Sequence, residues 1–195
     1  AVGPELIQLS WHSAQGSQDL TDGGELTQLG EWRIQAKDES GIGRIELSLN
    51  GQPLGQATQA GSYYRYAWDL SQVADGDYTL GIELKDTLDN VSQSQVELEV
   101  ALAAPAKPAL SLQSKASKTN TAQQVLLIQG QANTLAQVSL NGSELAELVT
   151  LNSTGQAQVP LTLAEGDNQL TARLRYSSRD QFGESSEALT ISLDT

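Results

Sequence analysis

Residues 41–90 decide the fold, and their sequence is GIGRIELSLNGQPLGQATQAGSYYRYAWDLSQVADGDYTLGIELKDTLDN. Apolar and polar residues alternate through 44–50, 63–70 and 77–85, which is the period of a β-strand with one buried face. Asn50-Gly51 is a strong hairpin signal, because both residues accept a positive φ. The stretch therefore predicts several short β-strands joined by tight turns.

The remainder of the first half continues this alternation. Residues 4–11 predict a strand with Ile7, Leu9 and Trp11 on one face, and residues 31–38 predict a strand with Trp32 facing inward. Residues 12–29 are polar and rich in turn-forming residues, which predicts a long loop with at most a short edge strand near 26–29. About seven short strands without helical periodicity are typical of a β-sandwich.

The second half repeats the turns of the first. Asn-Gly pairs occur at 50 and 141, and the glycines of two acidic turns occur at 76 and 166, so both kinds of turn recur after about 90 residues. This spacing indicates an internal duplication of one domain. The sequence ALAAPAKPA at 101–109 lies between the copies, and its prolines favour a short, semi-rigid connection. We therefore predict an all-β chain with β-sandwich domains over 1–102 and 110–195 and a Pro/Ala linker over 103–109.

The residues of the first half resemble the bacterial immunoglobulin-like modules of secreted and cell-surface proteins. The resemblance is carried by residues 38–51, 66–70, 75–80 and 85–90. Residues 125–193 resemble a related module that accompanies bacterial glycoside hydrolases and cell-surface proteins, through Gly130, 138–142, 163–168 and Leu170. The resemblance implies two tandem immunoglobulin-like β-sandwiches in an extracellular, cell-surface or periplasmic location.

One tyrosine and one leucine have expected places in such a sandwich. Tyr78 follows the acidic turn and precedes Leu80 by two residues, where a tyrosine corner returns its hydroxyl to the backbone. Leu80 then occupies the core position that a cysteine holds in antibody domains. The second half has Asn168 in place of Tyr78 and has no tryptophan, so we predict that it has a smaller, more aliphatic core and is the less stable domain.

The composition excludes several classes of function. The chain of 195 residues has 24 acidic and 11 basic side chains, a formal net charge of −13, which disfavours nucleic acid and anionic membrane surfaces as partners. It has no cysteine for a disulfide or a thiolate metal site, one histidine, and no apolar run long enough to span a bilayer. No methionine is present, even at position 1, and we expect the chain to be part of a longer protein.

Acidic residues cluster in the predicted turns, where Asp side chains usually accept hydrogen bonds from the local backbone. The alternative is a calcium site formed by Asp38, Asp86 and Asp89, because two loops at one end of a sandwich could bring these carboxylates together. The ligand spacing is not that of a regular calcium-binding loop. We therefore expect structural turns and no bound cofactor or metal, with these three residues as the calcium candidates.

Most aromatic residues fall on inward faces, which favours core packing over a carbohydrate platform. Trp11 and Tyr63 are the candidate ligand-binding residues, and Phe182 is a further aromatic residue that could be accessible. His12 has only Ser10 and Ser13 as nearby serines, and no nucleophile–base pair or spaced pair of acids can be assembled. The sequence therefore predicts no enzyme activity.

We expect a non-catalytic structural or adhesive spacer, or a protein-interaction module, within a larger bacterial surface or secreted protein. The expected partners are the neighbouring domains of that chain, with another surface protein or a glycan as a further partner, without nucleic acid and without membrane insertion of this segment. The alternative function is a carbohydrate-binding accessory module of a polysaccharide-degrading enzyme.

Overall fold

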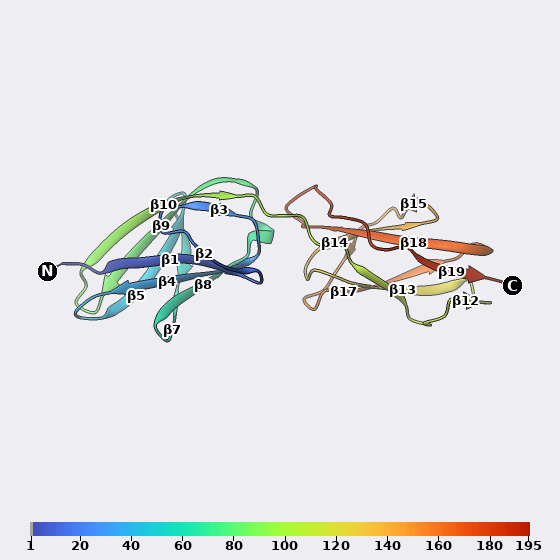
Figure 1. Cartoon of the computed structure of the whole chain (residues 1–195), viewed down its shortest axis with the longest axis horizontal. Helices are drawn as coiled ribbons and strands as arrows, with labels where there is room; N and C mark the ends of the chain where they lie inside the picture. The colour runs from blue at the N-terminus through green and yellow to red at the C-terminus, as the bar shows by residue number, and fades with distance from the viewer. Residues whose placement is uncertain (1) are drawn as a thin grey trace. The chain divides into compact units, whose positions relative to one another are not determined.

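The computed structural model describes residues 2–195, and its elements are β-strands apart from one short 3₁₀ turn, Leu70–Gln72. The chain divides into two compact units, one ending at Ala103 and the other beginning at Ala104. Figure 1 shows the strands of each unit arranged as facing layers. The two units are described separately below.

The first unit consists of two five-stranded sheets. One sheet has the order β2 (Gly16–Asp19), β1 (Glu5–Ser13), β4 (Gly30–Lys37), β8 (Tyr63–Trp68) and β7 (Thr58–Ala60). The other has the order β3 (Gly24–Leu26), β10 (Val91–Val100), β9 (Gly76–Asp86), β5 (Ile42–Leu49) and β6 (Gln52–Gln56). All pairings are antiparallel except that of β3 with β10.

This order is that of an immunoglobulin sandwich. Strands β1, β4, β8 and β7 correspond to A, B, E and D of that fold, and β10, β9, β5 and β6 correspond to G, F, C and C′. The chain crosses between the sheets after β4 and again after β6, which gives the Greek-key connection. The all-β, immunoglobulin-like class predicted from the sequence is confirmed.

Aromatic rings fill the centre of the first core. The rings of Trp11 and Trp32 meet edge to face with centroids 5.0 Å apart, and the rings of Trp32 and Trp68 stack at 6.5 Å. Tyr78 meets Trp68 edge to face at 6.3 Å, and Leu80 is fully buried as predicted. Such ring pairs add stabilisation beyond the area they bury. The indole nitrogen of Trp32 is the buried side-chain donor that has no hydrogen-bond partner within residues 2–195.

The second unit repeats the sandwich with shorter edges. One sheet contains β11 (Ala109–Leu112), β13 (Gln123–Gln129) and β17 (Gln156–Thr162). The other has the order β12 (Lys118–Thr119), β19 (Leu189–Leu193), β18 (Gly166–Arg175), β14 (Leu135–Leu140) and β15 (Ser143–Glu144), and β16 (Val149–Thr150) also pairs with β14. The short strand β12 runs parallel to β19, the last strand of its unit, as β3 runs parallel to β10 in the first unit.

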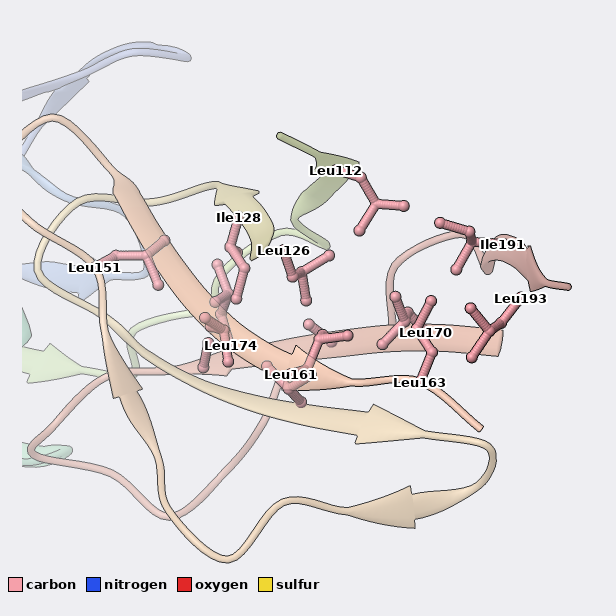
Figure 2. Packing of buried hydrophobic residues seen from close by; sticks show 14 residues of the cluster. Leu112, Leu126, Ile128, Leu151, Leu161, Leu163, Leu170, Leu174, Ile191 and Leu193 are labelled. Carbon is pink, nitrogen blue, oxygen red and sulfur yellow. The ribbon is translucent and has the colours of Figure 1, made fainter. Parts of the chain in front are cut away.

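The second core is aliphatic, as the sequence predicted. Fourteen buried residues form one cluster, and none of these residues is aromatic. Figure 2 shows side chains from both sheets gathered between them, among them Leu126, Leu161, Leu170, Leu174 and Ile191. Burial of one face of each strand is therefore the main source of stability in this unit.

The Asn-Gly turns of the two units make equivalent contacts. Asn50 has φ 49° and Asn141 has φ 51°, and the following glycines are also at positive φ, as this kind of hairpin turn requires. The side-chain oxygen of Asn50 accepts a hydrogen bond from the backbone N–H of Thr79 at 2.8 Å, and that of Asn141 accepts one from Gln169 at 2.8 Å. Each turn is thus attached to the strand that follows the acidic turn.

The corner at the acidic turn is made differently in each unit. The Tyr78 hydroxyl donates to the carbonyl of Ala74 at 2.9 Å, which confirms the predicted tyrosine corner. Asn168 is fully buried at the equivalent place in the second unit. Its side chain accepts from the N–H of Ala164 at 2.9 Å and donates to the carbonyls of Ala164 and Gly166 at 2.7 and 2.9 Å. An asparagine therefore replaces the tyrosine, with hydrogen bonds to the backbone of its own turn and one from the side-chain amide of Asn141.

Two expectations for the first strands are wrong. The predicted loop over 12–29 contains the edge strands β2 and β3, and β2 pairs with β1 through a tight hairpin at Ser13 and Gly16. All four residues of β2 are exposed, so the strand has no apolar face to produce an alternating pattern. Ile7 is 43% exposed because a bulge between Leu6 and Gln8 makes it the extra residue of β1.

The residues between the units are held by their own unit on each side. In the first unit, Ala101 and Ala103 donate backbone hydrogen bonds to the carbonyls of Leu26 and Thr27, both at 3.0 Å. In the second, a Cβ placed on Gly183 would overlap the carbonyl of Pro105, so this stretch lies directly against that loop. The Lys107 ammonium also pairs with Glu187 of the second unit.

Candidate functional site

Asp38 and Asp86 lie at the same end of the first unit and line one surface hollow together. Asp38 Oδ1 accepts hydrogen bonds from both the backbone N–H and the hydroxyl of Ser40. Asp86 is buried, and its Oδ1 accepts from the N–H groups of Leu88 and Asn90, both at 2.8 Å. These carboxylates close the two turns in which they lie.

The hydrogen bonds around Asp86 set its charge state. Burial pushes the pKa of Asp86 upward, but hydrogen bonds from Asn90, Leu88 and Ser40 together outweigh burial and hold this pKa below its ordinary value of 3.8. Asp86 is therefore a buried carboxylate that stays ionised at neutral pH. Its negative charge is satisfied by Leu88 and Asn90 of its own turn and by Ser40 of the neighbouring turn.

The third calcium candidate, Asp89, is the charge partner of a lysine and does not line the hollow with Asp38 and Asp86. Asp89 is exposed and forms an ion pair with Lys85 at 2.5 Å. Across residues 2–195 there is no group of three or more histidine, cysteine or acidic side chains placed to hold a metal ion. A calcium site at Asp38, Asp86 and Asp89 stays a prediction, and each of these carboxylates already has a partner within the chain.

The two candidate ligand-binding aromatic residues differ in accessibility. The expectation that Trp11 is accessible is wrong, because its side chain is only 3% exposed and its indole N–H donates to the carbonyl of Gln28 at 3.0 Å. Trp11 faces the core by the regular alternation of β1. Tyr63 is partly exposed, and the Arg33 guanidinium lies 4.8 Å from its ring centroid. Phe182 is likewise covered by Arg173, at 4.5 Å.

A serine and a histidine lie next to each other on β1. Ser10 Oγ and His12 Nε2 are 3.0 Å apart, because residues two apart on a strand share one face. Ser10 is 9% exposed, and its hydroxyl donates to the carbonyl of Arg33 at 3.3 Å. The hydroxyl of Ser10 is thus within hydrogen-bond distance of both the His12 ring and a backbone carbonyl of the neighbouring strand.

Burial also affects His12 itself. Partial burial lowers its pKa, and the positive charge of Arg33 lowers it further against the opposing effect of Glu31. His12 is thus neutral at pH 7.

No helix in the described residues is long and apolar enough to cross a membrane.

A hollow of about 430 Å³ lies on the outer face of the sheet formed by β10, β9, β5 and β6. Gly81 lies in its floor, between Ser48 of β5 and Gln95 of β10 in the strand register. Glu46 and Glu83 are directly opposite each other two register steps away, on the same face of the sheet. Further lining is provided by Gly51, Pro53, Gly55, Gln56 and Gln93.

Sequence reasoning did not find this hollow. The signal for it was Gly81, a glycine in the middle of an alternating strand where no turn is expected. The polar residues around it come from four strands separated in sequence, and alternation alone predicts only that such residues lie on the solvent face of the sheet. Their convergence depends on the register of those strands.

A comparison with known protein families finds a match within the first sandwich. Residues 30–82 match the family described as a bacterial Ig domain. This part of the first unit is thus similar to a bacterial Ig domain. The matched residues extend from the start of β4 into β9 and so include Trp32, Trp68 and Tyr78 of the aromatic core and the Asn-Gly turn. No curated protein matches the sequence.

Similar solved structures include the fibronectin(III)-like modules of CbhA from Clostridium thermocellum, with 12% identity over 88% of each chain and a TM-score of 0.35. The endo-β-1,4-mannanase from Thermotoga petrophila is 16% identical over 51% of this chain and 20% of its own, with a TM-score of 0.39. The BSP domain of a biofilm associated protein is 16% identical over 88% of this chain and 29% of its own, with a TM-score of 0.36. The chain thus spans less than a third of these last two proteins.

Proposed function

We propose that the chain is a non-catalytic structural spacer within a larger bacterial surface or secreted protein. The observation that carries this proposal is the repetition of internal turn contacts in both units. Asn50 and Asn141 each bond the backbone of the strand after the acidic turn, and Tyr78 and Asn168 each close that turn. Side chains that recur between the two units are thus engaged in stabilising the sandwich.

The most suggestive chemical groups also have structural partners. The carboxylates of Asp38 and Asp86 close turns, Trp11 packs in the core, and the hydroxyl of Ser10 donates to a backbone carbonyl. A scaffold needs such residues to be occupied within the fold, whereas an enzyme needs some of them directed at a substrate. This occupation supports a scaffold without catalytic activity.

The partners that fit this function are the domains before and after the chain in its parent protein. The stretch with Pro105 and Pro108 favours a short connection, because proline restricts the backbone and removes donors. Further contacts would be made with another surface protein through loops or edge strands. The location that we propose is extracellular, at the cell surface or in the periplasm.

Replacement of the chain in its parent protein tests the spacer. We expect an unrelated pair of tandem immunoglobulin-like domains of the same length to preserve the activity of the parent protein at the cell surface. A flexible Gly/Ser segment of the same number of residues should not, because it sets no fixed separation. Retention of activity with the flexible segment, or its loss with the unrelated pair, would contradict the spacer function.

A further inference from the structure

We propose that the hollow above Gly81 on the first unit is a binding site for a short stretch of neutral polysaccharide. The site combines the open floor at Gly81 with the hydroxyl of Ser48, the amides of Gln93 and Gln95, and the facing carboxylates of Glu46 and Glu83. This role is additional to that of a spacer and does not depend on it.

Gly81 lies inside a strand, where glycine is unfavourable, and it is not among the glycines with positive φ. A Cβ added there would overlap Ser48 Oγ, so the absence of a side chain leaves room for the Ser48 hydroxyl over the strand. Glycine within a strand often marks a place where a ligand approaches the backbone.

The second unit provides an internal comparison for this position. Ser139 pairs with Thr171 there as Ser48 pairs with Gly81, and in both units the next pair in the register is a leucine with a leucine. The same sandwich thus accommodates a β-branched residue beside a serine at the equivalent place. The second unit thus has a threonine where the first unit has Gly81 in the floor of the hollow.

The chemistry of the lining matches a polyhydroxylated ligand. Hydroxyl, amide and carboxylate groups together offer both donors and acceptors, which sugar hydroxyls can satisfy in both senses. In the part of the chain that the structure describes, Ser48 Oγ and the side-chain amides of Gln56 and Gln95 have no hydrogen-bond partner, so they can bond a ligand without breaking a contact of the fold.

The two glutamates narrow the choice of ligand. Glu46 is held by Arg44 at 3.3 Å, and Glu83 accepts from the Gln93 amide at 2.8 Å, so both carboxylates are positioned at the hollow. Facing carboxylates repel an acidic glycan. Charged residues are also depleted from the centres of protein–protein interfaces, and the lining has no exposed aromatic anchor. A neutral glycan fits these conditions best.

The size of the hollow agrees with this ligand. About 430 Å³ lies within the range of about 300–1,000 Å³ typical of small-molecule sites. Because no aromatic ring lines the hollow, there is no surface on which a sugar can stack. We therefore expect weak binding, with a Kd on the order of 1 mM.

The test is a titration of the full ¹⁵N-labelled chain with cellohexaose, xylohexaose, mannohexaose and laminarihexaose, followed by NMR. We expect at least one of these neutral sugars to shift the backbone amide of Gly81 and the side-chain amides of Gln93 and Gln95. Gly81→Thr should weaken this binding about tenfold or more. Thr is present at the equivalent position 171, so this variant should keep the fold.

Two further variants serve as a second test of the site and as a control. Gln95→Ala removes an exposed amide of the lining and should also weaken binding, whereas Thr171→Gly in the second unit should leave it unchanged. The proposal would be overturned if no sugar of the panel shifts these amides, or if the shifts persist in both Gly81→Thr and Gln95→Ala. Shifts caused by polygalacturonate in place of the neutral sugars would overturn it too. Because Gly81→Thr leaves the sandwich in place, its effect is independent of the spacer test.

Discussion

The side-chain amide of Asn141 donates a hydrogen bond of 3.0 Å to Oδ1 of Asn168. This contact joins the Asn-Gly turn of the second unit to its acidic turn. Together with the bonds to Ala164 and Gly166, it satisfies both the oxygen and the amide of the buried Asn168 side chain. In the first unit the equivalent residues are Asn50 and Tyr78, and Tyr78 bonds to Ala74 instead.

Replacement of Asn168 tests the importance of this network. We expect Asn168→Ala to lower the free energy of unfolding of the second unit by about 2–4 kcal/mol, because buried polar groups of Ala164 and Gly166 lose their partner. Urea unfolding followed by circular dichroism measures the change. Asn120→Ala, at an exposed position of the same unit, is the control and should have little effect. An equal effect of both variants would contradict the role assigned to Asn168.

Two substitutions at Asn50 in the first Asn-Gly turn distinguish the energetic cost of backbone strain from that of the lost side-chain hydrogen bond. Asn50→Gly accepts the positive φ but loses the bond to Thr79, which we expect to cost about 0.5–1.5 kcal/mol. Asn50→Ala should cost about 1 kcal/mol more, because an alanine is unfavourable in this left-handed conformation. Thermal unfolding of both variants in the same buffer gives the comparison. If Ala is tolerated as well as Gly, the turn geometry is not what selects Asn50.

The two units should differ in stability. The aromatic core of the first unit adds ring contacts that the aliphatic core of the second lacks, so we expect the second unit to unfold at the lower temperature. All three tryptophans lie in the first unit, so their fluorescence reports on that unit while circular dichroism reports on both. Fluorescence should follow the later transition. Separate melting of 1–103 and 104–195 provides the check, and earlier unfolding of the first unit would contradict the prediction.

Much of the fold could be predicted because burial follows the strand period. Leu80 and Trp32 were placed inward by alternation alone, and Tyr78 was placed at its corner by its distance from the acidic turn. The exposed strand β2 escaped prediction because backbone pairing, and not an apolar face, holds it against β1. Ile7 was misplaced because a bulge depends on the partner strand.

The candidate site was harder to predict than the fold. Trp11 belongs to an alternating strand and is buried accordingly, so its proposed accessibility conflicted with the pattern of its own strand. The hollow at Gly81 requires Ser48 and Gln95 to be its neighbours, and this depends on the register of three strands. The sequence alone contains one signal of this arrangement, which is a glycine inside a predicted strand where no turn is expected.

Two tryptophans of the first core allow the stability contribution of one indole hydrogen bond to be measured. Trp11→Phe leaves the carbonyl of Gln28 without its donor, whereas Trp32→Phe removes an indole N–H that already lacks a partner among the described residues. Both variants leave a smaller ring in the core, so the difference isolates the hydrogen bond. We expect Trp11→Phe to be more destabilising by about 1 kcal/mol. Urea unfolding measures both, and the reverse order would contradict the assignment of these donors.

The stability of the first unit should depend on pH through Asp86. Because the folded-state pKa of Asp86 lies below the unfolded value of about 3.8, its ionisation stabilises the fold above pH 3.8, and this stabilisation is lost as the pH falls through the lower, folded-state pKa. Asp86→Asn cannot titrate, so we expect its stability to change less steeply over that acidic window. Tryptophan fluorescence during acid titration reports on the unit that contains Asp86. Asp180→Asn removes one exposed charge from the other unit as a control, and an unchanged acid profile in Asp86→Asn would show that this carboxylate is not the group responsible.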